Sequence, residues 1–67
     1  MTDVALYDSG SVIGFAPLTE AAQDWFRRNV ETSEWQWLGD TLWVDQRLAS
    51  DLIAGIIEAG LLPGIAR

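Results

Sequence analysis

The first part of the chain contains two short stretches of alternating apolar and polar or small residues, separated by a turn sequence. Residues 4–7 and 12–15 therefore predict two antiparallel strands joined by a two-residue loop at Ser9-Gly10, because glycine tolerates the positive φ that such loops require. Pairing across this loop sets Tyr7 opposite Val12. Since successive side chains point to opposite sides of a strand, the core side collects Val4, Leu6, Ile13 and Phe15. The opposite side collects Ala5, Tyr7, Val12 and Gly14.

Helical periodicity follows the second strand. Pro17 ends that strand, and Thr19 is a suitable N-cap with Glu20 in the first turn, where the helix dipole favours an anion. Apolar residues then recur at helical spacing and predict a buried stripe: Ala22, Phe26 and Val30, with Ala21 and Trp25 beside them. On the solvent side, the spacing predicts two i,i+4 ion pairs, Asp24–Arg28 and Arg27–Glu31.

The stretch EWQWLGDTLWVD, residues 34–45, holds three of the four tryptophans and a second turn sequence. Gly39-Asp40 fits a type II′ turn, with glycine at the first central position. Pairing across this turn sets Leu38 opposite Thr41, and the remaining pairs follow in step. The predicted core side collects Trp35, Trp37, Leu42 and Val44, and the other side collects Gln36, Leu38, Thr41 and Trp43.

The clearest helical pattern begins after Asp45, a good N-cap, and ends near Gly60, which fits the left-handed position after a helix. Pro63 prevents continuation, so residues 62–67 are expected to form a loose tail. The apolar stripe is wide and comprises Leu48, Ala49, Leu52, Ile53, Ile56 and Ile57. The residues that point away from it are Arg47, Ser50, Asp51 and Glu58.

Two strands followed by a helix occur twice along the chain. This order of elements predicts a single α+β domain over residues 1–67. The simplest packing is a four-stranded antiparallel sheet with both helices on one face (ββαββα). The other face then remains bare and carries five residues that we predict to bind a partner: Tyr7, Val12, Leu38, Thr41 and Trp43. Trp and Tyr dominate interface hot spots, and so apolar a face is costly to leave in water. Two alternatives stay open, because residues 61–67 could cover this face and because two copies could pair through it.

Composition narrows the range of partners. The chain has 67 residues and a net charge of −6, from ten carboxylates and four arginines, with no lysine, histidine or cysteine. This charge repels phosphate backbones, so direct binding to nucleic acid or to an anionic membrane is disfavoured. A basic protein partner or plain solubility fits the charge better, and solubility is the stronger of the two.

The residue types that most enzymes recruit are missing. Without histidine, cysteine or lysine, the usual general bases and activated nucleophiles are absent, and no two carboxylates stand out as an acid–base pair. We therefore expect no enzymatic activity and no catalytic residue. Acidic residues are too sparse for a metal site and no glycine-rich phosphate loop is present, so no metal or other cofactor is expected.

Mimicry of DNA phosphates by carboxylates is another use of such a charge. Asp51 and Glu58 lie two turns apart on one side of the second predicted helix, and Asp40 and Asp45 extend the acidic surface. A solvated surface is the simpler interpretation, because the first helix neutralises part of its own charge with arginine.

No targeting or membrane segment is expected. The N-terminal stretch MTDVALYDS lacks the basic and apolar regions of a signal peptide. The most apolar stretch, residues 52–66, is too short to span a bilayer and is interrupted by Glu58, Gly60 and Pro63. A cytoplasmic location is therefore the expectation.

Two runs of the sequence, GSVIGFAPLTEAAQDWFRRNV and GDTLWVDQRLASDLIAGIIEAGL, resemble a family of small uncharacterised proteins from bacterial and phage or prophage genomes. The shared features are a helix start of the type PLT-A---W, an apolar strand, and a second helix with an arginine near its start and AGL at its end. In those proteins a His and a Tyr flank the arginine that Arg47 matches, whereas this chain has Gln46 and Leu48. The resemblance implies a mobile-element setting and no particular chemistry.

The resemblance also implies a kind of function, because small acidic phage proteins often act by binding a host protein, as anti-CRISPR inhibitors do. The favoured expectation is a non-enzymatic protein-interaction module, an inhibitor from a phage or mobile element that acts on a host nucleic-acid-handling protein. The alternative is a structural or accessory protein that homodimerises through the bare sheet face.

Overall fold

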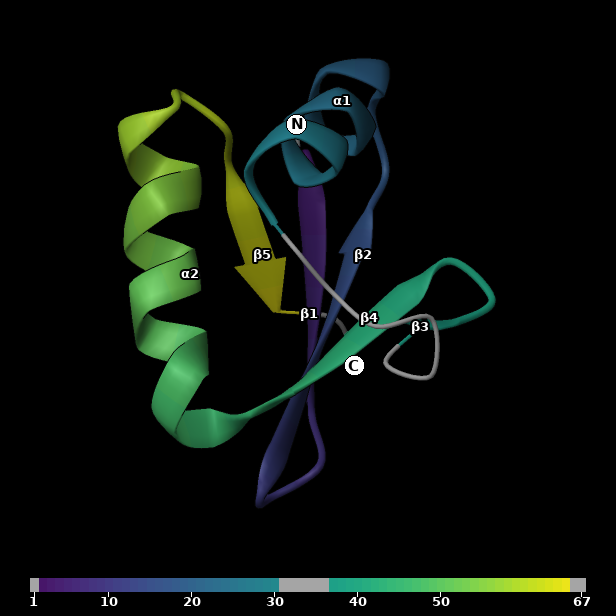
Figure 1. Ribbon diagram of the computed structural model, residues 1–67, viewed down its shortest axis with the longest axis vertical. Coiled ribbons are helices and arrows are strands. Elements are labelled where there is room, and N and C mark those ends of the chain that lie inside the picture. The colour runs from purple at the N-terminus through teal and green to yellow at the C-terminus, as the bar shows by residue number, and fades with distance from the viewer. Residues whose placement is uncertain (1, 31–36, 66–67) are drawn as a thin grey trace.

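The computed structural model describes residues 2–30 and 37–65 of the chain. The elements follow one another as β1 (Val4–Asp8), β2 (Val12–Pro17), α1 (Glu20–Asn29), β3 (Trp37–Leu38), β4 (Thr41–Asp45), α2 (Gln46–Glu58) and β5 (Pro63–Ile65). The strands form one sheet in the order β3-β4-β2-β1-β5, in which β5 runs parallel to β1 and every other neighbouring pair is antiparallel. The α+β class is therefore confirmed, whereas the expected four-stranded antiparallel sheet is a five-stranded mixed one (Figure 1).

Both helices pack on one face of the sheet, which we call the inner face. In Figure 1, α2 runs beside β5 and α1 lies over the ends of β1 and β2. Apolar side chains join the helices to β1, β2 and β4, and the largest fully buried ones are Phe15, Leu42, Ile56 and Val4. Because Phe15 pairs with Leu6 on one side and with Leu42 on the other, the alternating pattern of the sequence correctly identifies the buried side of these strands.

The β1–β2 hairpin has a different register from the expected one. Tyr7 pairs with Gly14 rather than with Val12. The Ser9 N–H donates to the Val12 carbonyl at 3.0 Å, so the two-residue loop is Gly10-Ser11, one position later than expected, and the Gly10 N–H donates to a carboxylate oxygen of Asp8 at 2.9 Å. The shift of two positions keeps every side chain on its expected face, because the side-chain period of a strand is two.

The β3–β4 hairpin forms as predicted. Leu38 pairs with Thr41, and Trp37 pairs with Leu42 across the two-residue turn. Gly39 has a φ of 62°, and no non-glycine residue in the described part of the chain has a positive φ, which is the type II′ pattern. Two expected members of the hairpin faces lie outside the described residues: Trp35 and Gln36.

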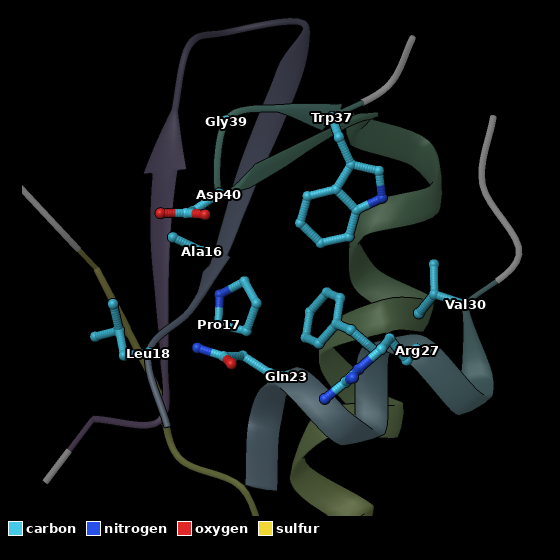
Figure 2. Close-up of a pocket in the computed structure, with 10 residues that line it drawn as sticks. Ala16, Pro17, Leu18, Gln23, Arg27, Val30, Trp37, Gly39 and Asp40 are labelled. Atoms are coloured by element: carbon cyan, nitrogen blue, oxygen red, sulfur yellow. The ribbon is translucent and has the colours of Figure 1, made fainter. Parts of the chain in front are cut away.

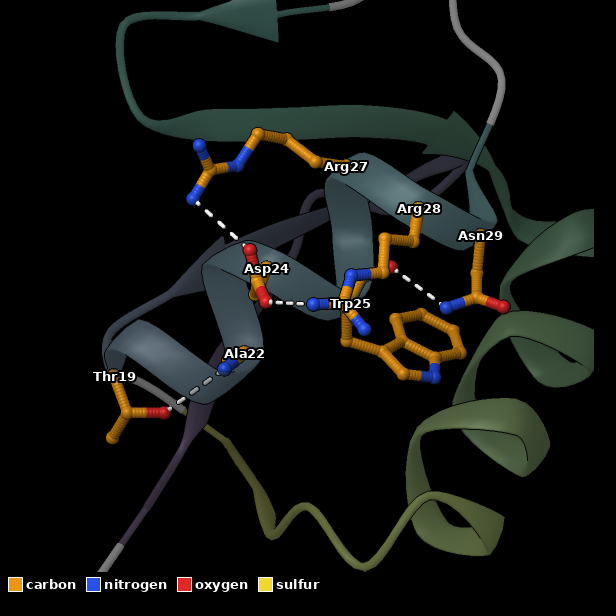
Figure 3. Close-up of polar contacts among 7 residues, drawn as sticks. All are labelled: Thr19, Ala22, Asp24, Trp25, Arg27, Arg28 and Asn29. Atoms are coloured by element: carbon orange, nitrogen blue, oxygen red, sulfur yellow. Dashed lines mark hydrogen bonds and ion pairs between the residues drawn. The ribbon is translucent and has the colours of Figure 1, made fainter.

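Helix α1 begins at the predicted cap. A backbone N–H of the first turn donates to the Thr19 hydroxyl at 3.2 Å. Asp24 forms the expected ion pair with Arg28 at 2.7 Å, and it also lies 3.5 Å from Arg27 (Figure 3). The other expected pair, Arg27 with Glu31, involves a residue outside the described part.

The buried stripe of α2 is narrower than expected. Asp45 caps the helix by accepting a backbone N–H of the first turn at 2.9 Å. Ala49 and Ile56 are buried, but Leu48 and Ile57 are exposed, contrary to the sequence prediction. These two positions lie roughly 90° to either side of the buried line at 100° per residue, which is beyond the reach of a single sheet surface.

The end of α2 directs the following residues back towards the sheet. Gly60 has a φ of 82°, the left-handed conformation expected after the helix. The Leu61 N–H donates to the Ile56 carbonyl at 3.1 Å, and the Gly60 N–H donates to the Ile57 carbonyl at 3.0 Å. These two bonds form a Schellman motif, which turns Leu61 into the core.

Strand β5 occupies part of the segment 62–67 that was expected to be a loose tail. The Asp3 N–H donates to the Leu62 carbonyl at 2.8 Å, and Pro63–Ile65 then continue in parallel along the free edge of β1. The sequence pattern does not indicate this strand, because its residues Pro, Gly and Ile have no strand periodicity and gain their pairing from β1. The expectation is therefore wrong for residues 63–65, while residues 66 and 67 lie outside the described part.

Candidate interaction surface

The face of the sheet that points away from both helices, which we call the outer face, carries the residues predicted to bind a partner. Gly14 pairs with Tyr7 on one side and with Trp43 on the other, so these three residues form a row across three strands. Their chain neighbours Phe15 and Leu42 belong to the core on the inner face. The row therefore lies on the side of the sheet opposite to the helices, as the sequence predicts.

The five predicted residues share this face but differ in exposure. Leu38 is 70% exposed, Tyr7 and Val12 are also exposed, and Thr41 and Trp43 are half-buried. Tyr7, Thr41 and Trp43 gather around the central glycine of β2. The other two lie further out, Val12 at the start of β2 and Leu38 on β3 at the sheet edge.

The indole of Trp43 packs on its own sheet, directly over Gly14. A Cβ atom at Gly14 would lie 2.9 Å from Cη2 and Cζ3 of Trp43 and 2.9 Å from Cγ2 of Thr41. The absence of a side chain at Gly14 leaves the room that the ring occupies, so the ring packs against the backbone of β2. The alternation of the sequence predicts the correct face for Trp43 but not the role of Gly14, although a glycine inside a strand pattern is a known signal of close approach.

Three hydrogen-bond donors on the outer face are available to a partner. Within the described part of the chain, the Trp43 indole N–H and the hydroxyls of Tyr7 and Thr41 form no hydrogen bond. No buried side-chain nitrogen or oxygen in that part lacks a partner either. The indole N–H and the Thr41 hydroxyl therefore reach solvent, as does the exposed phenol of Tyr7.

The acidic residues predicted to extend a charged surface do not come together. Asp45 is the cap of α2, and its carboxylate also lies 3.2 Å from Nε of Arg47. The Arg47 N–H, and then the Arg47 side chain, lower the pKa of Asp45 below its ordinary value. Asp51 and Glu58 each follow a buried residue of α2 by two positions, which is about 200° of rotation, so they point away from the sheet. Asp40 lies in the distant β3–β4 turn.

Asp3 is a structurally central carboxylate that the sequence analysis does not single out. Its two oxygens accept the Thr19 hydroxyl at 2.9 Å and the Leu62 N–H at 2.9 Å. The hydrogen bond from Leu62, and then that from Thr19, lower the pKa of Asp3 below its ordinary value of 3.8. Asp3 thus joins the starts of β1, α1 and β5, which is a stabilising role rather than a chemical one.

An open pocket of about 1000 Å³ lies between α1, the end of β2 and the β3–β4 turn. Figure 2 shows Trp37 on the hairpin side and Gln23 and Arg27 on the α1 side. Phe26 also lines the pocket, with its ring centre 6.3 Å from that of Trp37, and Asp40 supplies the one carboxylate among the described lining residues. Asp40 on the hairpin and Arg27 on α1 line different sides of the pocket (Figure 2), which offers binding groups of both charges but no acid–base pair.

Three kinds of comparison with known proteins find no match for this chain: neither a family model, nor a curated protein, nor a solved structure matches significantly. Among residues 2–30 and 37–65, no group of three or more Asp, Glu, His or Cys side chains is placed to hold a metal ion. Neither helix in this part of the chain has the length and apolar character needed to cross a bilayer.

Proposed function

We propose that this chain is a non-enzymatic protein-interaction domain whose contact surface is the outer face of its sheet. The observation that carries the proposal is the packing of Trp43 over Gly14, with an unused indole N–H, in the same row of the sheet as the exposed phenol of Tyr7. A tryptophan held in place before binding loses little side-chain entropy when a partner covers it. Trp and Tyr are also the residue types that contribute most at the centre of protein interfaces.

The neighbourhood of this row supports the same function. The central row carries no charged side chain, and Leu38 and Val12 extend it with exposed apolar surface. An apolar core within a more polar rim is the usual composition of a protein interface. Asp45, which pairs with Val12 across β2 and β4, begins the polar rim.

A second candidate function uses a different surface, the acidic side of α2. Asp51 and Glu58 form no ion pair in the described part of the chain, so their charge is available to a basic protein. An inhibitor that imitates nucleic-acid phosphates would bind through these carboxylates. The two candidates are separable by mutation, because these side chains point away from the sheet that carries the outer face.

Capture of partners by the immobilised chain, followed by titration of each identified partner in purified form, tests the proposal. Leu38→Asp, at a strongly exposed position of the outer face, should weaken binding at least about tenfold. Leu48→Asp is the matched control, because it makes the same change at a 59% exposed position on α2. The double variant Asp51→Asn, Glu58→Gln should bind as the wild type does. Loss of binding in the double variant alone would favour the acidic surface and contradict our proposal.

A further inference from the structure

A second open cavity, of about 320 Å³, lies on the inner face of the sheet, between α2 and the strands β1, β2 and β5. We call it the α2 groove, and the apolar residues that line it are Leu6, Ile13, Ala49, Ile53 and Ile65. We infer that this groove binds a small amphipathic cation, an aliphatic chain that ends in an ammonium group. The groove and the outer face lie on opposite sides of the sheet, so the inference goes beyond the proposed function.

The helices leave this part of the inner face open. In Figure 1, α1 lies over the ends of β1 and β2 that are far from their shared turn, and α2 runs beside β5. Leu6 and Ile13 therefore stay half-buried although they pack against the core, and Ile65 is 76% exposed. A ligand that covers these side chains removes apolar surface from water. The volume is near the lower limit of about 300 Å³ for small-molecule sites, so a short aliphatic chain fits it.

The charge of the groove favours a cation. Within the described part of the chain, Asp8 is the one charged residue that lines it. The Gly10 N–H donates to one carboxylate oxygen of Asp8 at 2.9 Å, and in that part of the chain the other oxygen accepts no hydrogen bond and joins no ion pair. One carboxylate is too few for a metal ion, which needs several oxygen ligands, but it can pair with one ammonium group. The net charge of −6 also attracts cations and repels an aliphatic carboxylate.

Polar and apolar residues lie at different ends of the groove, which fixes the direction of the ligand. Asp8 ends β1 beside the β1–β2 turn, whereas Leu6 pairs with Ile65 two residues earlier, roughly 6.6 Å away. The first residue of α2, Gln46, donates its N–H to a carbonyl of the same turn at 3.0 Å, and Ile53 follows roughly 10 Å further along the helix. An ammonium group beside Asp8 therefore directs its aliphatic chain between Ile53 and Ile65.

Titration of the ¹⁵N-labelled full chain with butyl-, hexyl- and octylammonium, followed by NMR chemical shifts, tests the site. Octylammonium should bind with a dissociation constant of about 1 mM or below, and each added methylene should tighten binding about two- to fourfold. The largest shifts should fall on the amides of Leu6, Ile13 and Ile53. The indole N–H of Trp43, on the outer face, should not shift.

The charge is tested by Asp8→Asn, whose amide oxygen can still accept the Gly10 N–H. This change should weaken octylammonium about two- to fivefold, the usual strength of an exposed ion pair, and should tighten octanoate. Opposite effects on the two probes are not expected from a merely structural change. Asp51→Asn is the matched control, because it removes the same charge from an exposed α2 position that does not line the groove, and it should change either affinity by less than about 1.5-fold.

The aliphatic wall is tested by Ile65→Ala, which should weaken octylammonium at least about threefold. Leu62→Ala is the matched control, because it shortens a side chain that is 55% exposed and does not line the groove. The control should bind octylammonium within about twofold of the wild type. The exposure of both positions makes these changes compatible with folding, which circular dichroism checks.

Three outcomes would overturn the inference: shifts that do not saturate by about 20 mM octylammonium, shifts centred on the outer face, or equal affinity of the wild type for octylammonium and octanoate. Leu38→Asp, which tests the proposed function, should bind octylammonium within about twofold of the wild type. Failure of the groove therefore leaves the outer face as an interaction surface, and failure of the outer face leaves the groove.

Discussion

A single glycine, Gly14, determines where the largest side chain of the outer face lies. Replacing Gly14 by Ala should lower the free energy of unfolding by about 1–3 kcal/mol, because the new Cβ would overpack against Trp43 and Thr41. Urea unfolding followed by circular dichroism measures this loss.

The control for this prediction is a double-mutant cycle. In a chain that already carries Trp43→Ala, the change Gly14→Ala should cost much less, because the indole that it displaces is gone. An equal cost in both backgrounds would mean that the contact with Thr41, and not the ring of Trp43, requires a glycine at this position.

Asp3 gives the second prediction for a single residue. Its pKa is lowered in the folded chain, so the unfolded chain binds a proton more readily, and the stabilising contribution of this carboxylate is present above about pH 4 and lost as the pH falls through the lower, folded value. Asp3→Asn should therefore be less stable than the wild type at about pH 7, and the difference in unfolding free energy should shrink below about pH 4.

Urea titrations at several pH values measure this difference. Asp51→Asn is the matched control, because it removes the same charge from an exposed helix position that forms no hydrogen bond in the described part of the chain. A difference between wild type and Asp3→Asn that stays constant down to about pH 3 would contradict the role of Asp3.

At the scale of elements, the turn after α2 gives two adjacent leucines very different degrees of burial. The Schellman turn buries Leu61, which is 8% exposed, and leaves Leu62 at 55%. Leu61→Ala should cost about 2–4 kcal/mol of unfolding free energy, because it removes buried methyl groups and leaves a cavity. Leu62→Ala makes the same change on the surface and should cost less than about 1 kcal/mol. Thermal or urea unfolding of the two variants compares them directly, and equal losses would contradict the different burial of the two leucines.

The elements also show what a sequence can and cannot predict. The caps at Thr19 and Asp45 and the turn at Gly39 are correct because neighbouring residues determine them. The outer-face set is placed correctly for a similar reason, since alternation along a strand survives a register shift of two. Strand β5 and the packing of Trp43 over Gly14 are not predicted. Each depends on pairing with a strand that is distant in the sequence, β5 with β1 and β4 with β2.

At the scale of the whole molecule, charge and apolar surface are segregated. The uncharged row lies on the outer face, while the carboxylates of Asp51 and Glu58 point away from the sheet on α2. Salt should therefore affect the two candidate functions differently. Binding of a partner through the uncharged row of the outer face should change less than about twofold between about 0.05 M and about 0.5 M NaCl, because this row has no charge to screen.

Binding of a basic protein to the acidic side of α2 should instead weaken over the same range of salt. Titration of an identified partner at both salt concentrations distinguishes the two functions. Binding that weakens strongly with salt would show that attraction between charges, and not the uncharged outer face, holds the complex together.

The contact between Asp3 and Leu62 joins residues that are 59 positions apart in the sequence. During synthesis, the outer edge of β1 stays without its parallel neighbour until the segment from Leu62 to Ile65 has left the ribosome. The open edge can recruit a strand from another nascent chain in that interval. Completion of the sheet thus follows the synthesis of all its other strands, and crowding of ribosomes on one message would favour exchange of β5 between neighbouring chains.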